Sequence, residues 1–268
     1  MRRAAAFALP ALLLAGCAAA SQAPAQTDAL TIENPYPLEY AKQFTVDVCA
    51  GGYDLITIDG SRYLVVPEGA AAPANLDADI TVLQQPIQNI YLVSSSAMDP
   101  IISIGGLGAV ALSGTQAENW YLDAARTAME QGEIAYAGKY SAPDYETILS
   151  ADCGLAIENT MIYHTPEVKE QLEKFGVPVL VERSSYESDP LARMEWVKLY
   201  GILLGRTEEA ERIFDDAVQR IAPLLDEEPT GKTAAFFSIT SNNLATVRKG
   251  GDYVAKMIGL AGGSYVFA

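Results

Sequence analysis

The order of apolar segments predicts an α/β protein with two lobes and a helical bridge between them. Short apolar runs alternate with amphipathic runs through residues 89–188, which is the pattern of βαβ units and a largely parallel sheet. Residues 189–226 hold two long helical patterns with no strand between them. New strand patterns begin at residue 227 but are too few to bury a second parallel sheet, so we expect an incomplete second lobe.

The first lobe is predicted from five runs that are apolar along their length, as strands covered on both faces are. These runs are residues 89–95, 109–114, 134–138, 153–159 and 177–183. Helical patterns separate them at residues 97–108, 117–133, 142–151 and 165–176. Ligands of open parallel sheets bind beyond the carboxyl ends of the strands. The candidate site loops are therefore residues 94–96, 138–140, 158–160 and 184–187.

The other segments flank this lobe. Residues 31–88 are expected to form a β-hairpin segment and a linker, because alternating runs are separated by turns that contain glycine. The bridge is expected over 189–226, with Asp189-Pro190 and Thr207 as helix starts. Residues 227–268 should open the second lobe, with strands at 232–240 and 244–250 and a helix at 252–263.

Composition limits the possible partners. The chain has 268 residues, half of them apolar, with a formal net charge of −16 and a pI of about 4.4. A phosphate backbone attracts basic surfaces, so this charge argues against nucleic acid and against direct contact with acidic lipids.

The first residues indicate export. Met1-Arg2-Arg3 precedes an apolar run at 4–14 that is too short to span a bilayer, which needs about 20 residues. The run ends in "LAGC", which resembles a bacterial lipobox with Cys17 as the acylated residue. We therefore expect a signal peptide at 1–16, a flexible tether at 17–30 and a lipid anchor on the extracytoplasmic face of the cell membrane. An ordinary signal peptide with a chance cysteine is the alternative.

Two further cysteines, Cys49 and Cys153, leave two possibilities open. Export permits a disulfide between them. Two separate buried thiols are at least as consistent with their sequence contexts, since free cysteine is often a core residue.

Motifs for catalysis and nucleotide binding are excluded by their context. "GLGAVA" at 106–111 follows a helix and opens a strand, the reverse of a dinucleotide fingerprint. "GKT" at 231–233 resembles the end of a P-loop but precedes its strand. His164 is the one histidine, and the chain contains no G-x-S-x-G elbow. We therefore expect no catalytic residues and no metal site.

Cations are scarce in this acidic chain, and several fall near the candidate loops. Lys139, Arg183, Arg193 and Arg248 either form surface ion pairs or line a basic pocket for an anionic chelate, with Tyr140 and Tyr186 as flat walls. Glu146, on a short helix, is either a solvated carboxylate or a docking point for a basic partner.

Taken together, three stretches resemble the substrate-binding lipoproteins of ABC transporters for iron siderophores, haem and cobalamin. They are "LQQPIQNIYLVSSSAMDPIISIGGLGAVALSG", "YAGKYSAPDYETILSADCGLAIEN" and "LEKFGVPVLVERSSYESDPLARMEWVKLYGILLGRTEEAERIF". The stretch "KTAAFFSITSNNLATVRKGGDYVAKMIGLAGG" resembles the opening of the second lobe in this class. The resemblance covers most of the mature chain and rests on order and spacing.

The resemblance implies two Rossmann-like α/β lobes joined by a long bridging helix, with the ligand between them. It implies a chelated metal ligand, most readily a ferric siderophore, with haem or cobalamin as alternatives, and no enzymatic cofactor. The permease and its ATPase would be the protein partners, with Glu146 as one docking residue. The expected ligand-binding residues are Ser95, Ser96, Lys139, Tyr140, Asn159, Ser185, Tyr186, Arg193 and Arg248.

Two other functions stay open at this stage. One is an exported α/β hydrolase that uses serines of the 94–96 or 184–187 loops with His164 as the base. The other is a surface adhesion or scaffold lipoprotein.

Overall fold

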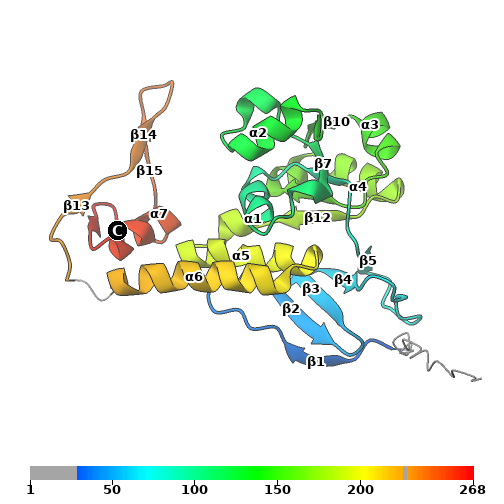
Figure 1. Ribbon diagram of the computed structural model, residues 1–268. Coiled ribbons are helices and arrows are strands. Elements are labelled where there is room, and N and C mark those ends of the chain that lie inside the picture. The colour runs from blue at the N-terminus through cyan, green and yellow to red at the C-terminus, as the bar shows by residue number, and fades with distance from the viewer. Residues whose placement is uncertain (1–28, 226–227) are drawn as a thin grey trace, which may run out of the picture.

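The computed structural model describes residues 29–225 and 228–268. The elements group into an N-terminal sheet, a first lobe, a pair of long helices and a small C-terminal segment (Figure 1). The expected signal peptide, tether and acylated Cys17 lie outside the described residues, apart from the last residues of the tether. None of the described helices is long and apolar enough to cross a membrane.

The first lobe is built on a five-stranded parallel sheet in the order β12-β11-β6-β7-β8. Along β6, β11 and β12, successive apolar side chains enter two different apolar clusters, so both faces of the sheet are covered there. This confirms the α/β class predicted from the apolar runs. The strands are β6 (Ile90–Leu92), β7 (Val110–Ser113), β8 (Ala135–Tyr136), β11 (Ala156–Asn159) and β12 (Val179–Glu182).

Helices cover the two faces of this sheet differently. Residues of α1 (Met98–Ser103) and α2 (Asp123–Glu130) share one cluster with the bridge helices, whereas α3 (Tyr145–Ser150) and α4 (Pro166–Lys174) pack in the other. A small hairpin, β9 (Gly138–Lys139) with β10 (Ala142–Pro143), precedes α3. Five 3-10 turns complete the lobe: η1 (Ser95–Ala97), η2 (Leu107–Ala109), η3 (Ala117–Asn119), η4 (Thr160–His164) and η5 (Ser184–Tyr186).

The N-terminal sheet is larger than the hairpin expected from the sequence. Four antiparallel strands, β1 (Ile32–Pro35), β2 (Phe44–Cys49), β3 (Tyr53–Ile58) and β4 (Ser61–Val66), are joined by β5 (Ile80–Gln84), which pairs in parallel with β4. β5 lies in the stretch expected to be a linker. Alternation in β2 and β3 places one set of side chains, including Phe44 and Ile56, in the core shared with the bridge helices. Cys49 and Cys153 are two separate buried thiols.

The bridge consists of α5 (Pro190–Leu203) and α6 (Thr207–Leu225), which lie side by side (Figure 1). Asp189 caps α5 by accepting the Leu191 N–H, as the sequence predicts. A Cβ at Gly201 would come within 2.5 Å of the Ala210 Cβ, so only glycine permits this close approach of the two helices. Of the 14 residues of α5, 11 are buried, which makes it the central helix of the core.

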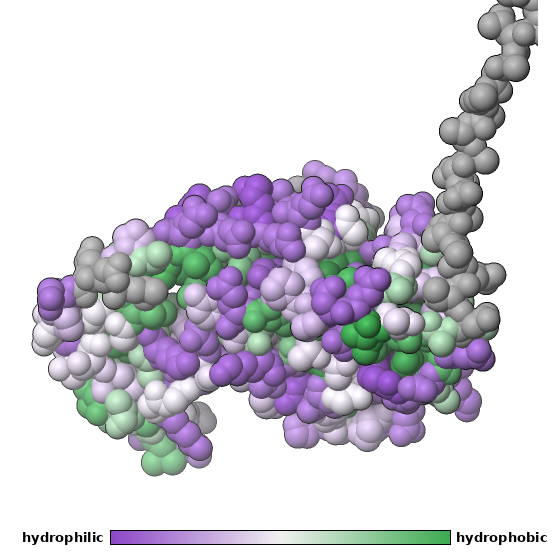
Figure 2. Space-filling model, turned by 90° about the horizontal axis from the view of Figure 1, so that it is seen from below, coloured by the Kyte–Doolittle hydropathy of each residue, from purple (hydrophilic) through white to green (hydrophobic). Residues whose placement is uncertain are grey.

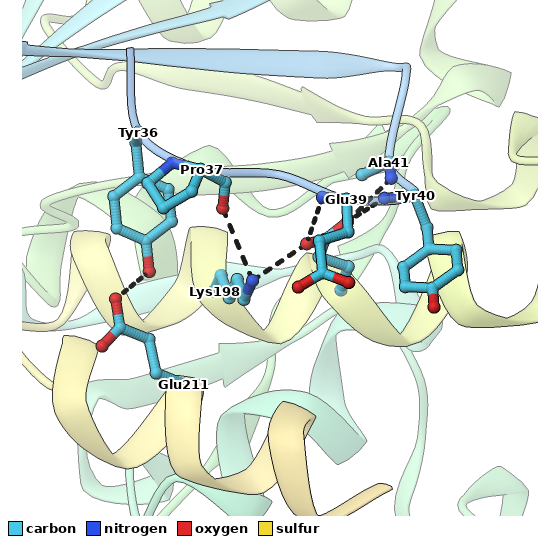
Figure 3. A network of polar contacts seen from close by, with 8 residues as sticks. Tyr36, Pro37, Glu39, Tyr40, Ala41, Lys198 and Glu211 are labelled. Carbon is cyan, nitrogen blue, oxygen red and sulfur yellow. Dashed lines mark hydrogen bonds and ion pairs between the residues drawn. The ribbon is translucent and has the colours of Figure 1, made fainter. Parts of the chain in front are cut away.

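A buried carboxylate on α5 holds the loop between β1 and β2. Glu195 is fully buried and accepts the backbone N–H groups of Glu39, Tyr40 and Ala41 at 2.8–2.9 Å (Figure 3). It also pairs with the Lys198 Nζ at 2.9 Å. Burial alone raises the pKa of Glu195, but these donors together hold its pKa below the usual value. The loop is therefore fixed to the bridge by charge-assisted hydrogen bonds.

The C-terminal segment, residues 228–268, carries little secondary structure. β13 (Thr233–Ala234) pairs in parallel with β16 (Ser264–Tyr265), and β14 (Phe237–Ile239) forms a hairpin with β15 (Ala245–Val247). α7 (Tyr253–Leu260) contacts α5. Every residue of β14 and β15 is exposed, although four of these six residues are apolar.

One buried carboxyl in the first lobe has no hydrogen-bond partner. Glu158, near the end of β11, is 0% exposed, and neither of its oxygens has a partner in the described residues. Burial raises the pKa of Glu158 from 4.5 to about 8. The side chain is therefore protonated at neutral pH, which lowers the cost of burying it among apolar groups.

Replacing Glu195 by alanine should destabilise the fold strongly. The change leaves Lys198 buried without its partner and removes the acceptor of three backbone N–H groups, which costs about 3–5 kcal/mol. Urea unfolding of the two proteins measures the difference. Glu209→Ala, which breaks an exposed pair with Arg212, is the control and should cost less than about 1 kcal/mol. Equal losses in the two variants would contradict the role of Glu195.

Stability should fall as the pH rises, because of Glu158. The folded state keeps a proton on Glu158 that the unfolded chain releases above about pH 4.5. The free energy of unfolding therefore falls as the pH rises from about 4.5 to about 8 and then levels off. One pKa unit corresponds to about 1.4 kcal/mol, so the loss amounts to a few kcal/mol. Urea unfolding from about pH 5 to about pH 8.5 should show that Glu158→Gln flattens the slope, whereas Glu170→Gln at an exposed position leaves it unchanged. Parallel slopes in all three proteins would refute the assignment.

Candidate ligand-binding cavity

A cavity of about 580 Å³ lies where the first lobe and the bridge meet the C-terminal segment. One wall is the loop after β12 together with the first turn of α5, and the other is the chain that leads into α7. Figure 2 shows an indentation between the C-terminal segment, on the left, and the rest of the molecule. The lining residues are Ser185, Tyr186, Glu187, Ser188, Arg193, Val247, Arg248, Lys249, Gly251, Asp252 and Tyr253.

The first-lobe wall is a rim loop, residues 184–188, that starts at the carboxyl end of β12. Glu182, the last residue of β12, is 2% exposed and accepts the N–H of Ser184 at 2.7 Å. Its other oxygen accepts the hydroxyls of Ser94 and Ser96, at 2.9 and 2.8 Å. Glu182 therefore ties the loop after β6 to the rim loop, and its charge is satisfied inside the protein.

A second buried carboxylate holds the rim loop from the other side. Glu187 is 3% exposed, and one of its oxygens accepts the N–H groups of Lys42 and Gln43, both at 2.9 Å. The same oxygen accepts the indole N–H of Trp196 on α5 at 3.2 Å. Although Glu187 lines the cavity, its hydrogen bonds are directed to the N-terminal loop and the bridge.

Arg193 connects both walls of the cavity. Its Nε donates to the backbone oxygen of Glu187 at 3.1 Å and its Nη2 to that of Ser185 at 2.6 Å. The guanidinium carbon lies 3.5 Å from the centroid of the Tyr253 ring on α7. The in-plane donors therefore reach the rim loop while the flat face covers an aromatic ring of the C-terminal segment.

The second wall carries two more cations. The Arg248 guanidinium lies 3.6 Å from an Asp252 carboxylate oxygen, and both side chains are partly exposed. Asp252 also accepts the Val254 N–H and so caps α7. Lys249 is exposed and has no ion pair among the described residues.

The charge balance of the cavity is opposite to that of the chain. Its lining contains Arg193, Arg248 and Lys249 against the two carboxylates of Glu187 and Asp252. One oxygen of Glu187 accepts three N–H donors, while Asp252 accepts the cap N–H of α7 and pairs with Arg248 at 3.6 Å. In a chain of net charge −16, this local surplus of cationic donors can bind an anion.

The structure gathers four of the nine expected ligand-binding residues at this cavity: Ser185, Tyr186, Arg193 and Arg248. Ser95 is exposed on η1, and Ser96 donates to Glu182. The Asn159 side chain caps η4 by accepting the Met161 N–H. Lys139 is exposed on β9, and Tyr140 follows it. These five lie at loops beyond the strands of the first lobe and do not line the cavity.

Several cavity residues were missed by the sequence analysis. Asp252 and Tyr253 lie at the start of a correctly expected helix, for which the Asp252 cap was the available signal, and Lys249 lies in the loop before it. Arg183 was considered as a cation and forms an ion pair with Asp59 at 2.7 Å while its guanidinium covers the Tyr186 ring at 4.5 Å. Glu146 is exposed in the first turn of α3.

No family model matches the chain. An uncharacterised lipoprotein of Methanocaldococcus jannaschii is 21% identical over 228 residues, which cover 79% of this chain. The match spans 54% of that protein, so the chain corresponds to about half of its length.

Among solved structures, a periplasmic haem-binding protein of Vibrio cholerae superposes with a TM-score of 0.55 at 17% identity, covering 68% of this chain and 66% of that one. A periplasmic binding protein of Veillonella parvula superposes with a TM-score of 0.58 at 15% identity, covering 80% and 66%. A possible iron-binding protein of Staphylococcus epidermidis gives 0.51 at 14% identity, covering 66% of each chain. The chain therefore has the fold of the periplasmic substrate-binding proteins, as its resemblance to that class implies.

Proposed function

We propose that this chain is part of an extracytoplasmic solute-binding lipoprotein that captures a chelated metal ligand and delivers it to the permease of an ABC transporter. The observation that carries the proposal is the cavity between the first lobe and the C-terminal segment, where cations and aromatic rings gather in an otherwise acidic chain. A ferric siderophore is the first candidate ligand, and haem or cobalamin are the others.

The chemistry of the cavity favours a chelate over a small inorganic ion. A volume of about 580 Å³ lies in the range of sites for ligands of drug-like size. Tyr186 and Tyr253 offer flat apolar surfaces, while Arg248 and Lys249 offer charged donors to peripheral oxygens. No cluster of three or more metal-ligating side chains occurs in residues 29–225 and 228–268, so we propose that the metal arrives already chelated.

The hydrogen bonds of the serines in the candidate loops favour a binding function over hydrolysis. The hydroxyls of Ser94 and Ser96 hydrogen bond to Glu182, and His164 is exposed at the end of η4. A hydrolase would need a base within hydrogen-bond reach of its nucleophile. The binding proteins with similar folds support the same proposal.

Delivery would depend on the lipid anchor and on an exposed acidic contact. A tether from acylated Cys17 would keep the binding protein near its transporter at a high effective concentration. Glu146 is exposed at the start of α3, outside the cavity lining, so it is free to pair with an arginine of the permease.

Chelate binding should quench the intrinsic fluorescence of the full-length mature protein. Trp196 is a sensitive reporter because its indole hydrogen bonds to Glu187 in the cavity wall. Titrations with a ferric trihydroxamate, a ferric tricatecholate, haemin and cyanocobalamin should give saturable quenching by at least one of them. If none of the four gives saturable quenching, the proposal fails.

The same titration should depend on Arg248. We expect Arg248→Ala to weaken binding about ten-fold, because it removes a charge-assisted contact worth at least about 1.4 kcal/mol. Arg212→Ala, which removes an exposed arginine of α6 outside this cavity, should leave the affinity unchanged.

Reversing the charge at Glu146 should impair uptake without changing affinity. Glu146→Arg places a cation where the permease would present arginines, so cellular uptake of the bound chelate should fall several-fold. Glu167→Arg, in the exposed first turn of α4, is the matched control. Unchanged uptake in Glu146→Arg, or an equal loss in both variants, would remove the docking role.

A further inference from the structure

Arg193 is a side chain that contacts both walls of the cavity. On one side it donates to two backbone oxygens of the rim loop, at residues 185 and 187. On the other side its guanidinium lies flat on the ring of Tyr253, at 3.5 Å from the centroid. Arg193 belongs to α5 and Tyr253 to α7, so this contact links the bridge, the first lobe and the C-terminal segment.

We infer that Arg193 and Tyr253 form a latch that fixes the cavity walls before any ligand enters, with Arg193 acting as a positioning residue. The inference deepens the proposed function, because it assigns how the same cavity keeps its shape. It separates Arg193 from Arg248 and Lys249, whose charged ends are available to a ligand.

The hydrogen-bond pattern of Arg193 supports a positioning role. Its donors point to backbone carbonyls, and Arg193 forms no ion pair with a carboxylate among the described residues. Only a planar guanidinium can donate to two carbonyls in its plane and stack on a ring through its face. A lysine at this position would keep the charge and lose this geometry. The substitution therefore separates a role in positioning the cavity walls from a role in attracting an anionic ligand.

Other contacts across the cavity are weaker. Lys256 on α7 pairs with Asp189 at 3.3 Å, but the two side chains are 44% and 33% exposed, so solvent screens the pair. The stack of Arg183 on Tyr186 lies within the first-lobe wall and does not cross the cavity. The attachment of α7 to the rim loop therefore depends mainly on Arg193.

The rim loop that Arg193 contacts is also held by hydrogen bonds to the N-terminal loop and to α5. Glu187, whose backbone oxygen accepts from Arg193, is anchored through its carboxylate to Lys42, Gln43 and Trp196. The latch therefore joins α7 to a loop with little freedom of its own. A preformed cavity of this kind reduces the ordering cost when a ligand binds.

Hydrogen exchange of the ligand-free, full-length protein tests the latch. In Arg193→Lys we expect exchange to be roughly five- to ten-fold faster at the hydrogen-bonded amides of Tyr186 and Glu187, and at the first turn of α7 around Lys256. Tyr253→Leu should give the same pattern on α7. Lys249→Ala, which alters a cavity cation without a latch contact, should give wild-type rates.

A binding measurement completes the test with haemin as the probe. If Arg193 positions the walls, Arg193→Lys should weaken haemin quenching as much as Arg193→Ala does, whereas Arg248→Lys should retain most of the affinity. Wild-type exchange rates in Arg193→Lys would overturn the latch, whatever the probe does. Faster exchange together with no haemin binding by the wild-type protein would support the latch and count against haem as the ligand.

Discussion

The carboxylate of Glu195 is the interaction on which the arrangement of this molecule depends. It lies in the middle of α5, a helix buried on almost every side, and it meets three backbone N–H groups of the loop between β1 and β2. That loop begins and ends in the N-terminal sheet, whose apolar face packs on the same helix. Without an acceptor on α5, the loop would bury unsatisfied donors, and the sheet would lose its fixed position against the bridge.

Two other residues of α5 hold the wall of the cavity. Two residues before Glu195, Arg193 reaches the rim loop and α7, and one residue after Glu195, Trp196 donates to Glu187. Glu187 in turn accepts N–H groups at residues 42 and 43, next to the loop that Glu195 holds. The N-terminal sheet, the bridge and the cavity wall are therefore parts of one hydrogen-bonded assembly. Five backbone N–H groups of the segment between β1 and β2 donate to the two carboxylates of this assembly.

Much of the first lobe could be predicted because its signal is local. Apolar runs such as 177–183 identify strands, and the rule for parallel sheets placed Ser185 and Tyr186 beyond the carboxyl end of a strand, where the structure has them. The parallel pairing of β4 with β5 could not be predicted, because neither segment's sequence contains a signal for its pairing partner or register. For the same reason the sequence did not indicate that Lys249 and Tyr253 share a cavity with Arg193. Their proximity follows from the contact of α7 with α5.

Buried carboxylates explain how a chain of net charge −16 can present a cationic cavity. Glu182, Glu187 and Glu195 are almost fully buried, and each accepts backbone N–H groups from a loop that needs fixing. N–H and hydroxyl donors inside the protein stabilise the charges of Glu182 and Glu187, and Glu195 also pairs with Lys198. Glu158 lacks such donors and stays protonated at neutral pH. Glu182, Glu187 and Glu195 direct these hydrogen bonds into the protein, and the cavity lining holds three cations, Arg193, Arg248 and Lys249, against the carboxylates of Glu187 and Asp252.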